Sequence, residues 1–244
     1  ITRNRAEGNE AGAIGGGVLV LGAEGIGIFN AYGTVIEENK AESSVAHGGG
    51  VAVEDGGTFN AYENTMITGN AAESGYFAIG GGVAIYDGGT FNAYEGTKIT
   101  ENKVEGEDEA YGGGVFVWGG TFNATTTTIE ENTAKAEGGV GLAYGGGVGV
   151  ASFEEINGIF NAYEGTTITE NKVEGDWAYG GGVAVFWDGS FNAYAGTKIA
   201  SNTAEGEDEA YGGGVAIEDG TFDATGTTIA DNTAKAGASG DANG

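Results

Sequence analysis

The chain of 244 residues has no Cys and no Pro, a single His, and only 9 Lys and Arg residues against 36 Asp and Glu residues. Without Cys no disulfide can form, and cysteine usage indicates no redox compartment. The net charge of −27 repels nucleic acids and anionic lipids by long-range Coulomb forces. No apolar run approaches the ~20 residues of a membrane-spanning helix. We therefore expect neither a nucleic-acid partner nor membrane insertion by this region.

Glycine is abundant, with 52 residues, yet 40% of the chain is hydrophobic and the Val, Phe and Ile residues are regularly placed. This regularity favours a narrow packed core over a flexible, low-complexity chain. Triplets of glycine divide the sequence into units of 32 to 35 residues. The triplets begin at Gly15, Gly48, Gly80, Gly112, Gly145, Gly180 and Gly212.

Each unit has three short apolar parts. The first reads Gly-Gly-Gly-Val-x-Val/Ile, as at Val83–Ile85. The second reads Gly-(Thr/Ile/Ser)-Phe-Asn-Ala-Tyr, as around Phe91, and the third reads Thr-x-Ile-x-x-Asn, as at Ile99 to Asn102. Period-2 alternation bounded by Gly or Asn is typical of strands, and the glycine density excludes helices.

Three short strands per unit, repeated in register, predict an all-β fold: a right-handed parallel β-helix solenoid of about seven coils. We expect one domain over residues 1–244, a rod roughly 34 Å long. The Val, Phe and Ile columns should point inward, and the residues between the paired Val side chains, such as Ala52, Ala84 and Phe116, should point outward on a flat surface. The segments between each Asn and the next triplet are interpreted as loops.

Two residue types mark the corners of the predicted coils. The Asn that ends the third part can bond the backbone of the bend and the Asn of the next coil, which predicts an asparagine ladder. The glycine triplet lets the chain turn with positive φ and enter the tight interior without a Cβ clash.

These motifs resemble the repeats of polymorphic outer-membrane proteins and of bacterial and archaeal surface proteins with pectin-lyase-like β-helices. The resemblance runs from Ile1 to about Ala234. It implies a surface-exposed, adhesin-like domain without shared catalytic residues. The sequence shows neither an anchoring β-barrel nor a cell-wall anchor, and both ends stop in mid-repeat without a polar cap. We expect either a fragment or a filament whose open ends stack.

Catalysis is not expected. Polysaccharide-cleaving β-helices need a basic residue beside their carboxylates, and bases are scarce here. The only arginines are Arg3 and Arg5, while Lys98 and Lys198 occupy outward positions. The only histidine, His47, is predicted to be a solvated loop residue.

Two near-identical acidic segments are the candidate metal sites. Their carboxylates could hold Ca²⁺ through oxygen ligands, although no known calcium-loop motif is present. A solvated, solubilising turn is the other interpretation. No cofactor is required by the sequence, and calcium is the one candidate, with Glu107, Asp108, Glu109, Glu207, Asp208 and Glu209 as its ligands.

The outward residues of the second part form the candidate interaction face. A flat grid of Thr, Asn and Tyr could bind a sugar chain, with the Tyr rings as apolar platforms, order water as ice-binding surfaces do, or pack on a second copy. Repetition alone also produces such columns in any solenoid. The residues of this face are Thr58, Asn60, Tyr62, Thr90, Asn92, Tyr94, Asn123, Asn161 and Asn192.

We therefore expect a non-enzymatic structural or adhesive protein of the cell surface or extracellular space. Its expected partners are further copies of itself, packed end to end or side by side into a fibre, or a surface glycan. An ice-binding protein and a polysaccharide-binding or polysaccharide-degrading module are the alternatives, the last resting on fold analogy alone.

Overall fold

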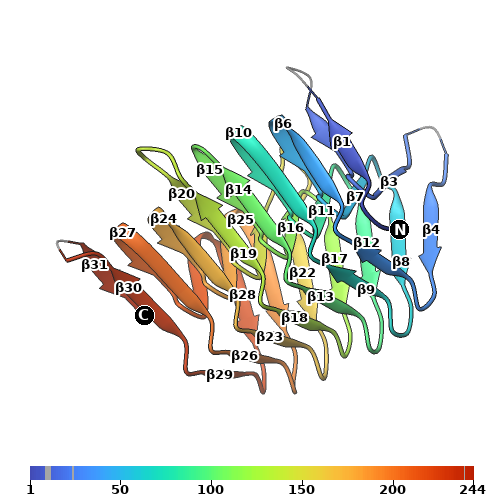
Figure 1. Ribbon diagram of the computed structural model, residues 1–244. Helices are drawn as coiled ribbons and strands as arrows, with labels where there is room; N and C mark the ends of the chain where they lie inside the picture. Colours follow the sequence, from blue (N-terminus) through green and yellow to red (C-terminus); the bar gives the residue numbers. More distant parts are fainter. Residues whose placement is uncertain (9–11, 24, 239) are drawn as a thin grey trace.

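The computed structural model describes residues 1–8, 12–23, 25–238 and 240–244, and Figure 1 shows them as a stack of coils. Its regular structure consists of 31 strands arranged in three sheets, and every strand ladder is parallel. One sheet has seven strands, one for each coil. The prediction of an all-β, parallel β-solenoid of about seven coils is confirmed.

Sheet A contains the third part of each repeat. Its central Ile side chains stack inward, and Ile67, Ile99 and Ile129 are fully buried. Its strands are β5 (Val35–Glu37), β9 (Met66–Thr68), β13 (Lys98–Thr100), β18 (Thr128–Glu130), β23 (Thr167–Thr169), β26 (Lys198–Ala200) and β29 (Thr228–Ala230).

Sheet C contains the first and second parts together, because its last two strands run through both parts without a break. The inward columns of Val and Phe lie here, as predicted, with Val83, Val115 and Phe122 fully buried. Its strands are β3 (Val18–Leu21), β4 (Ile28–Ala31), β7 (Val51–Glu54), β8 (Thr58–Ala61), β11 (Val83–Tyr86), β12 (Thr90–Ala93), β16 (Val115–Trp118), β17 (Thr121–Ala124), β21 (Val148–Ala151), β22 (Ile159–Ala162), β25 (Val183–Ala193) and β28 (Val215–Ala224).

Sheet B corrects the sequence interpretation, because it is built from the segments that we expected to be loops. Alternate residues of these segments are small and point inward, and they form an alanine-rich core of their own. The strands are β1 (Arg5–Glu7), β2 (Ala13–Ile14), β6 (Lys40–His47), β10 (Ala71–Ile79), β14 (Lys103–Gly106), β15 (Glu109–Tyr111), β19 (Thr133–Ala136), β20 (Leu142–Tyr144), β24 (Lys172–Tyr179), β27 (Thr203–Tyr211), β30 (Thr233–Ala236) and β31 (Asp241–Asn243).

The glycine triplets join sheet B to sheet C, and one triplet shows why three glycines are needed. Gly112 has a φ of 66°, a left-handed conformation that side chains disfavour. A Cβ on Gly113 would lie 2.4 Å from the carbonyl oxygen of Gly146. A Cβ on Gly114 would lie 2.8 Å from the carbonyl oxygen of Gly147. The coils can stack at this turn only because all three positions lack side chains.

The predicted asparagine ladder is present at the corner between sheets A and B. The Nδ2 of Asn102 donates to the Oδ1 of Asn132 at 3.0 Å and to the carbonyl oxygen of Ile67 at 2.9 Å. Its Oδ1 accepts from the backbone N–H of Asn70 at 3.0 Å. Each buried amide therefore satisfies backbone groups that the bend leaves outside the strand ladders.

Candidate functional site

The interaction face lies on the outer surface of the second half of sheet C, where its Asn residues form a second ladder. The Nδ2 of Asn92 donates to the Oδ1 of Asn60 at 2.9 Å, and the Nδ2 of Asn123 donates to the Oδ1 of Asn92 at 2.9 Å. Asn161 and Asn192 continue the column in the same way. These amides are only half-buried, so the rest of their hydrogen-bonding capacity faces outward.

The Tyr residues of the interaction face stack on one another. The rings of Tyr32 and Tyr62 are 4.5 Å apart at 6°, and those of Tyr62 and Tyr94 are 4.9 Å apart at 6°. A second stack joins Tyr163 and Tyr194 at 4.9 Å. Neighbouring rings cover each other's faces, so the column presents mostly ring edges, and the predicted apolar platforms remain open only at the ends of each stack.

The Thr column beside the Asn ladder is less uniform. Thr58 and Thr90 are half-buried on the outer surface and in register, as expected, but Ile28, Ile159 and Ser190 take equivalent positions in other coils. The Asn ladder is therefore continuous along this face, beside a mixed Thr column and a Tyr column divided into two stacks.

The acidic segments lie within sheet B. Glu109 and Glu209 belong to β15 and β27, where each carboxylate accepts a hydrogen bond from the Tyr two residues later. Glu107 and Asp108 are exposed at the turn between β14 and β15. Among residues 1–8, 12–23, 25–238 and 240–244, no group of three or more His, Cys, Asp or Glu side chains has a geometry that could hold a metal ion. The calcium hypothesis remains a prediction without geometric support.

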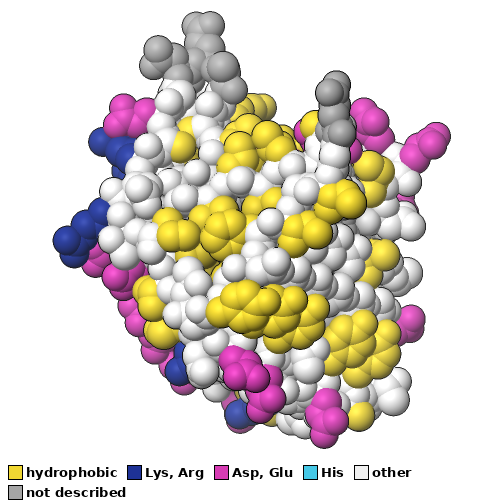
Figure 2. Space-filling view, turned by 90° about the vertical axis from the view of Figure 1, so that its right-hand side faces the viewer, with side chains coloured by type: hydrophobic (Ala, Val, Ile, Leu, Met, Phe, Trp, Pro, Cys, Tyr) yellow, Lys and Arg dark blue, Asp and Glu magenta, His cyan; other side chains and the backbone are white. Residues whose placement is uncertain are grey.

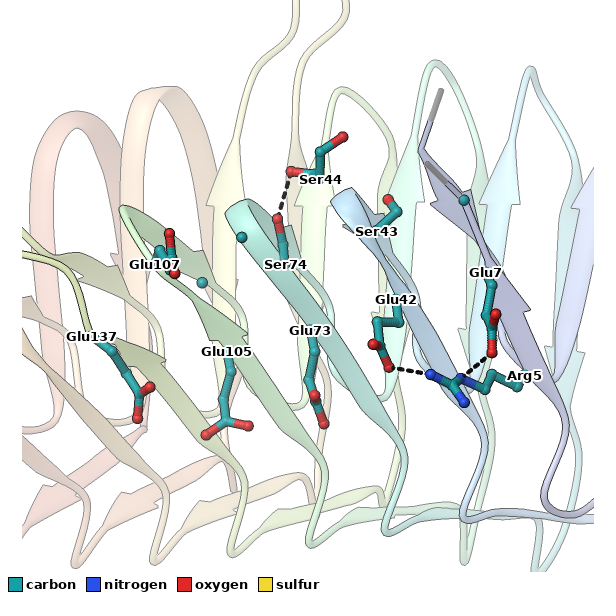
Figure 3. Close-up of a pocket in the computed structure, with 13 residues that line it drawn as sticks. Arg5, Glu7, Glu42, Ser43, Ser44, Glu73, Ser74, Glu105, Glu107 and Glu137 are labelled. Atoms are coloured by element: carbon teal, nitrogen blue, oxygen red, sulfur yellow. Dashed lines mark hydrogen bonds and ion pairs between the residues drawn. The ribbon is translucent and has the colours of Figure 1, made fainter. Parts of the chain in front are cut away.

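The outer surface of sheet B carries most of the basic side chains, on strands such as β1, β6 and β24. Glu7, Glu42, Glu73 and Glu105 form a column in register along it (Figure 3). Arg5 pairs with both Glu7 and Glu42 at 2.8 Å. Lys40 and Lys172 bridge glutamates of adjacent coils in the same way, so the scarce cations separate like charges that the stacking brings together.

The outer surface of the first half of sheet C is not the flat, exposed surface that we predicted. Ala52, Ala84 and Phe116 are at most 1% exposed. At the turn into sheet C, β15, β20, β24 and β27 end in a Tyr column, whereas β6 and β10 end in His47 and Ile79. Tyr111 of this column packs against Phe116 and Phe186. The Tyr that precedes four of the glycine triplets is the sequence feature from which this aromatic layer could have been predicted.

The prediction for His47 is also wrong, since it ends β6 and packs edge-on against Tyr86, with ring centroids 5.4 Å apart. Both of its ring nitrogens are buried without a hydrogen-bond partner in the described part of the chain, and burial lowers the pKa of the imidazole to about 4.

Glu54, in β7, is 4% exposed. Burial raises the pKa of its carboxyl to about 7, the charges of Asp55 and Asp87 add to the rise, and a hydrogen bond with Tyr86 opposes it. The sequence pattern did not single out Glu54.

The described ranges contain no helix with the length and hydropathy needed to cross a lipid bilayer. Comparison of the chain with protein-family models, curated proteins and solved structures gives no match.

Proposed function

We propose that this chain is a non-enzymatic structural and adhesive domain of an extracellular surface, and that it contacts glycans through the interaction face. The observation that supports this proposal is the pair of outward columns, a hydrogen-bonded Asn ladder beside stacked Tyr rings. Both columns are fixed in register by fully paired parallel strands. A rigid surface loses little conformational entropy when it binds an extended, repetitive ligand.

The chemistry of the interaction face favours a neutral glycan. The half-buried amides and the Tyr hydroxyl groups offer donors and acceptors to sugar hydroxyls, and the Tyr ring edges offer apolar contact. A net charge of −27 would repel acidic polysaccharides. We also propose, as part of the same function, that these repeats are related to those of adhesin-like surface proteins with pectin-lyase-like β-helices.

A glycan microarray probed with the wild-type chain and two Tyr variants tests the proposal. Tyr62→Ser removes the ring at the centre of the longer stack, whereas Tyr76→Ser removes a Tyr that is 56% exposed on sheet B, away from the interaction face. We expect neutral glycans to bind the wild type and the Tyr76 variant and to bind the Tyr62 variant at least tenfold more weakly. The absence of neutral-glycan binding by the wild type, or an equal loss in both variants, would contradict the proposal.

Self-assembly is the structural part of the proposal. Figure 2 looks onto the end of the solenoid that carries the N-terminus, where hydrophobic side chains gather between charged edges. Leu19, Leu21 and Ile28 are among the exposed hydrophobic residues of this coil, and end-to-end packing would bury them. Analytical ultracentrifugation and electron microscopy at high protein concentration should show oligomers or fibres, and a strictly monomeric particle would rule this part out.

Ice binding is a second candidate, favoured by the Asn ladder, which holds polar groups in a flat lattice with fixed 2.9 Å bonds. The Ile and Ser residues that interrupt the Thr column make this face less regular and so argue against ice binding. A measurement of thermal hysteresis at high protein concentration decides, since an ice-binding face should shape ice crystals and a glycan-binding one should not.

A further inference from the structure

The Tyr column of the interaction face is interrupted at one coil, where Thr125 stands in place of a Tyr. The backbone N–H of Thr125 donates to the carbonyl oxygen of Ala93 at 2.9 Å, and that of Tyr163 donates to Ala124 at 2.8 Å. Tyr94, Thr125 and Tyr163 therefore occupy equivalent positions of three consecutive coils. Thr125 is exposed and has no ring to place between the other two.

The exposure of the rings reflects this interruption. Tyr62, covered on both faces by Tyr32 and Tyr94, is partly buried, whereas Tyr94 and Tyr163 are exposed, at 39% and 37%. Each of these two rings lacks a Tyr neighbour on the side of Thr125. Their ring centroids should stand roughly 10 Å apart, twice the ~4.8 Å strand spacing, so the place of one ring of the column is open to a flat group that stacks on both.

Charge selects among the flat groups that could enter. Glu95 and Glu164 directly follow Tyr94 and Tyr163 and are exposed, whereas Thr125 is followed by Thr126. The backbone N–H of Thr126 donates to the carbonyl oxygen of Glu164 at 3.1 Å, so the two neighbouring turns are in contact. The vacant ring position thus has two aromatic faces, an acidic residue next in sequence to each of these two Tyr residues, and no basic residue of its own segment.

We propose that the vacant position between Tyr94 and Tyr163 binds an arginine side chain presented by a basic partner protein. A guanidinium group is planar, stacks on aromatic faces, carries a permanent positive charge and donates hydrogen bonds to carboxylates. Its linear stem can leave the site outward. A neutral pyranose carries no positive charge, so it gains nothing from the negative potential of this surface. The net charge of −27 adds long-range attraction for a basic partner.

Short blocked peptides of sequence Gly-Arg-Gly and Gly-Lys-Gly are the probes, titrated into the whole chain while the ring signals of Tyr94 and Tyr163 are followed by NMR. We expect the Arg peptide to shift these two ring signals selectively and to bind about tenfold more tightly than the Lys peptide, because the ammonium cannot stack.

Two variants at one residue separate the vacant site from general charge attraction. Thr125→Tyr restores the ring that other coils carry and should abolish the selective shifts without loss of stability, while Thr125→Ala leaves the position open and should retain them. Equal binding of the Arg and Lys peptides, shifts that persist in the Thr125→Tyr variant, or selective shifts of the same rings with neutral methyl glycosides in place of the Arg peptide would overturn the proposal.

Discussion

Asparagine occurs in two ladders along this solenoid, and its side chain makes different bonds in each. In the corner ladder the amide bonds backbone groups as well as the next Asn, and it is buried. In the outer ladder it bonds only to other Asn side chains and stays partly exposed. The same residue type is therefore part of the fold at one position and part of a surface at the other.

Removal of one amide from each ladder should separate these roles. Asn102→Ala leaves the carbonyl oxygen of Ile67 and the N–H of Asn70 without their hydrogen-bond partner in a buried corner. We expect a loss of about 3 kcal/mol in the free energy of unfolding. Asn92→Ala in the outer ladder should cost less than about 1 kcal/mol. Urea denaturation of the two variants and the wild type gives the comparison, and equal losses would contradict the assignment of roles.

Two titratable residues, the buried Glu54 and the partly buried His47, should make stability depend on pH. Because burial raises the pKa of Glu54 to about 7, above its ordinary value of 4.5, its neutral form stabilises the fold at low pH, and this contribution of at most about 3 kcal/mol is lost as the pH rises to 7. His47 acts in the opposite sense. Its pKa, lowered to about 4, makes stability fall as the pH drops from about 6.5 to 4.

The variant Glu54→Gln isolates the first of these contributions. Relative to the wild type, it should gain stability as the pH rises from 5 to 8, because the amide never ionises in the buried position. Thermal unfolding across this pH range measures the difference, and a constant offset between the two proteins would show that Glu54 titrates normally in the fold.

At the scale of the elements, two of the three corners between the sheets are built in different ways. The amide ladder forms one, and the glycine triplets form the turn from sheet B into sheet C. The strands of sheet B were not predicted from the sequence because their inward residues are mostly Ala, such as Ala72 and Ala110, which contribute little to a hydrophobic pattern. Its charged outward residues gave these segments the composition of loops.

Glycine substitutions at two positions test the close approach of the coils. Gly113→Ala would place a Cβ 2.4 Å from the carbonyl oxygen of Gly146 and from the carbonyl carbon of Thr133, so we expect a loss of at least about 4 kcal/mol or failure to fold. Gly75→Ala, in β10, meets nothing within 4 Å and should change stability by no more than about 0.5 kcal/mol. Circular dichroism and thermal unfolding distinguish the outcomes, and a stable Gly113 variant would contradict the packing of the turn.

At the scale of the whole molecule, the excess of 36 acidic over 9 basic residues acts on every coil. Most cations form ion pairs on sheet B, and with so few basic residues most of the carboxylates cannot be paired with a residue of opposite charge. Such a molecule is destabilised by self-repulsion, and screening by salt should relieve part of it.

The calcium hypothesis can be tested against this background. If Glu107, Asp108 and Glu109 bind Ca²⁺, the melting temperature should rise with Ca²⁺ and fall with chelator by more than NaCl of equal ionic strength produces. The triple variant to the corresponding amides should remove the specific part of the rise. If Ca²⁺ and NaCl raise the melting temperature equally, the calcium hypothesis is wrong and these residues form solvated turns.

The sequence by itself determined the coil, its length and its inward Val, Phe and Ile columns. The alternation of apolar residues and the length of the repeat can both be read from the sequence, and they stay the same when the coils stack in register. It also determined the glycine turns and the corner amides, whose backbone requirements are local. Only the tertiary structure decided that the outward Ala84 and Phe116 are covered, that Glu54 and the ring nitrogens of His47 are buried, and that the side chains of Tyr94 and Tyr163 belong to separate stacks on either side of Thr125. These outcomes depend on how sheet B folds back over sheet C and on which side chains meet across coils, and no single segment encodes that contact.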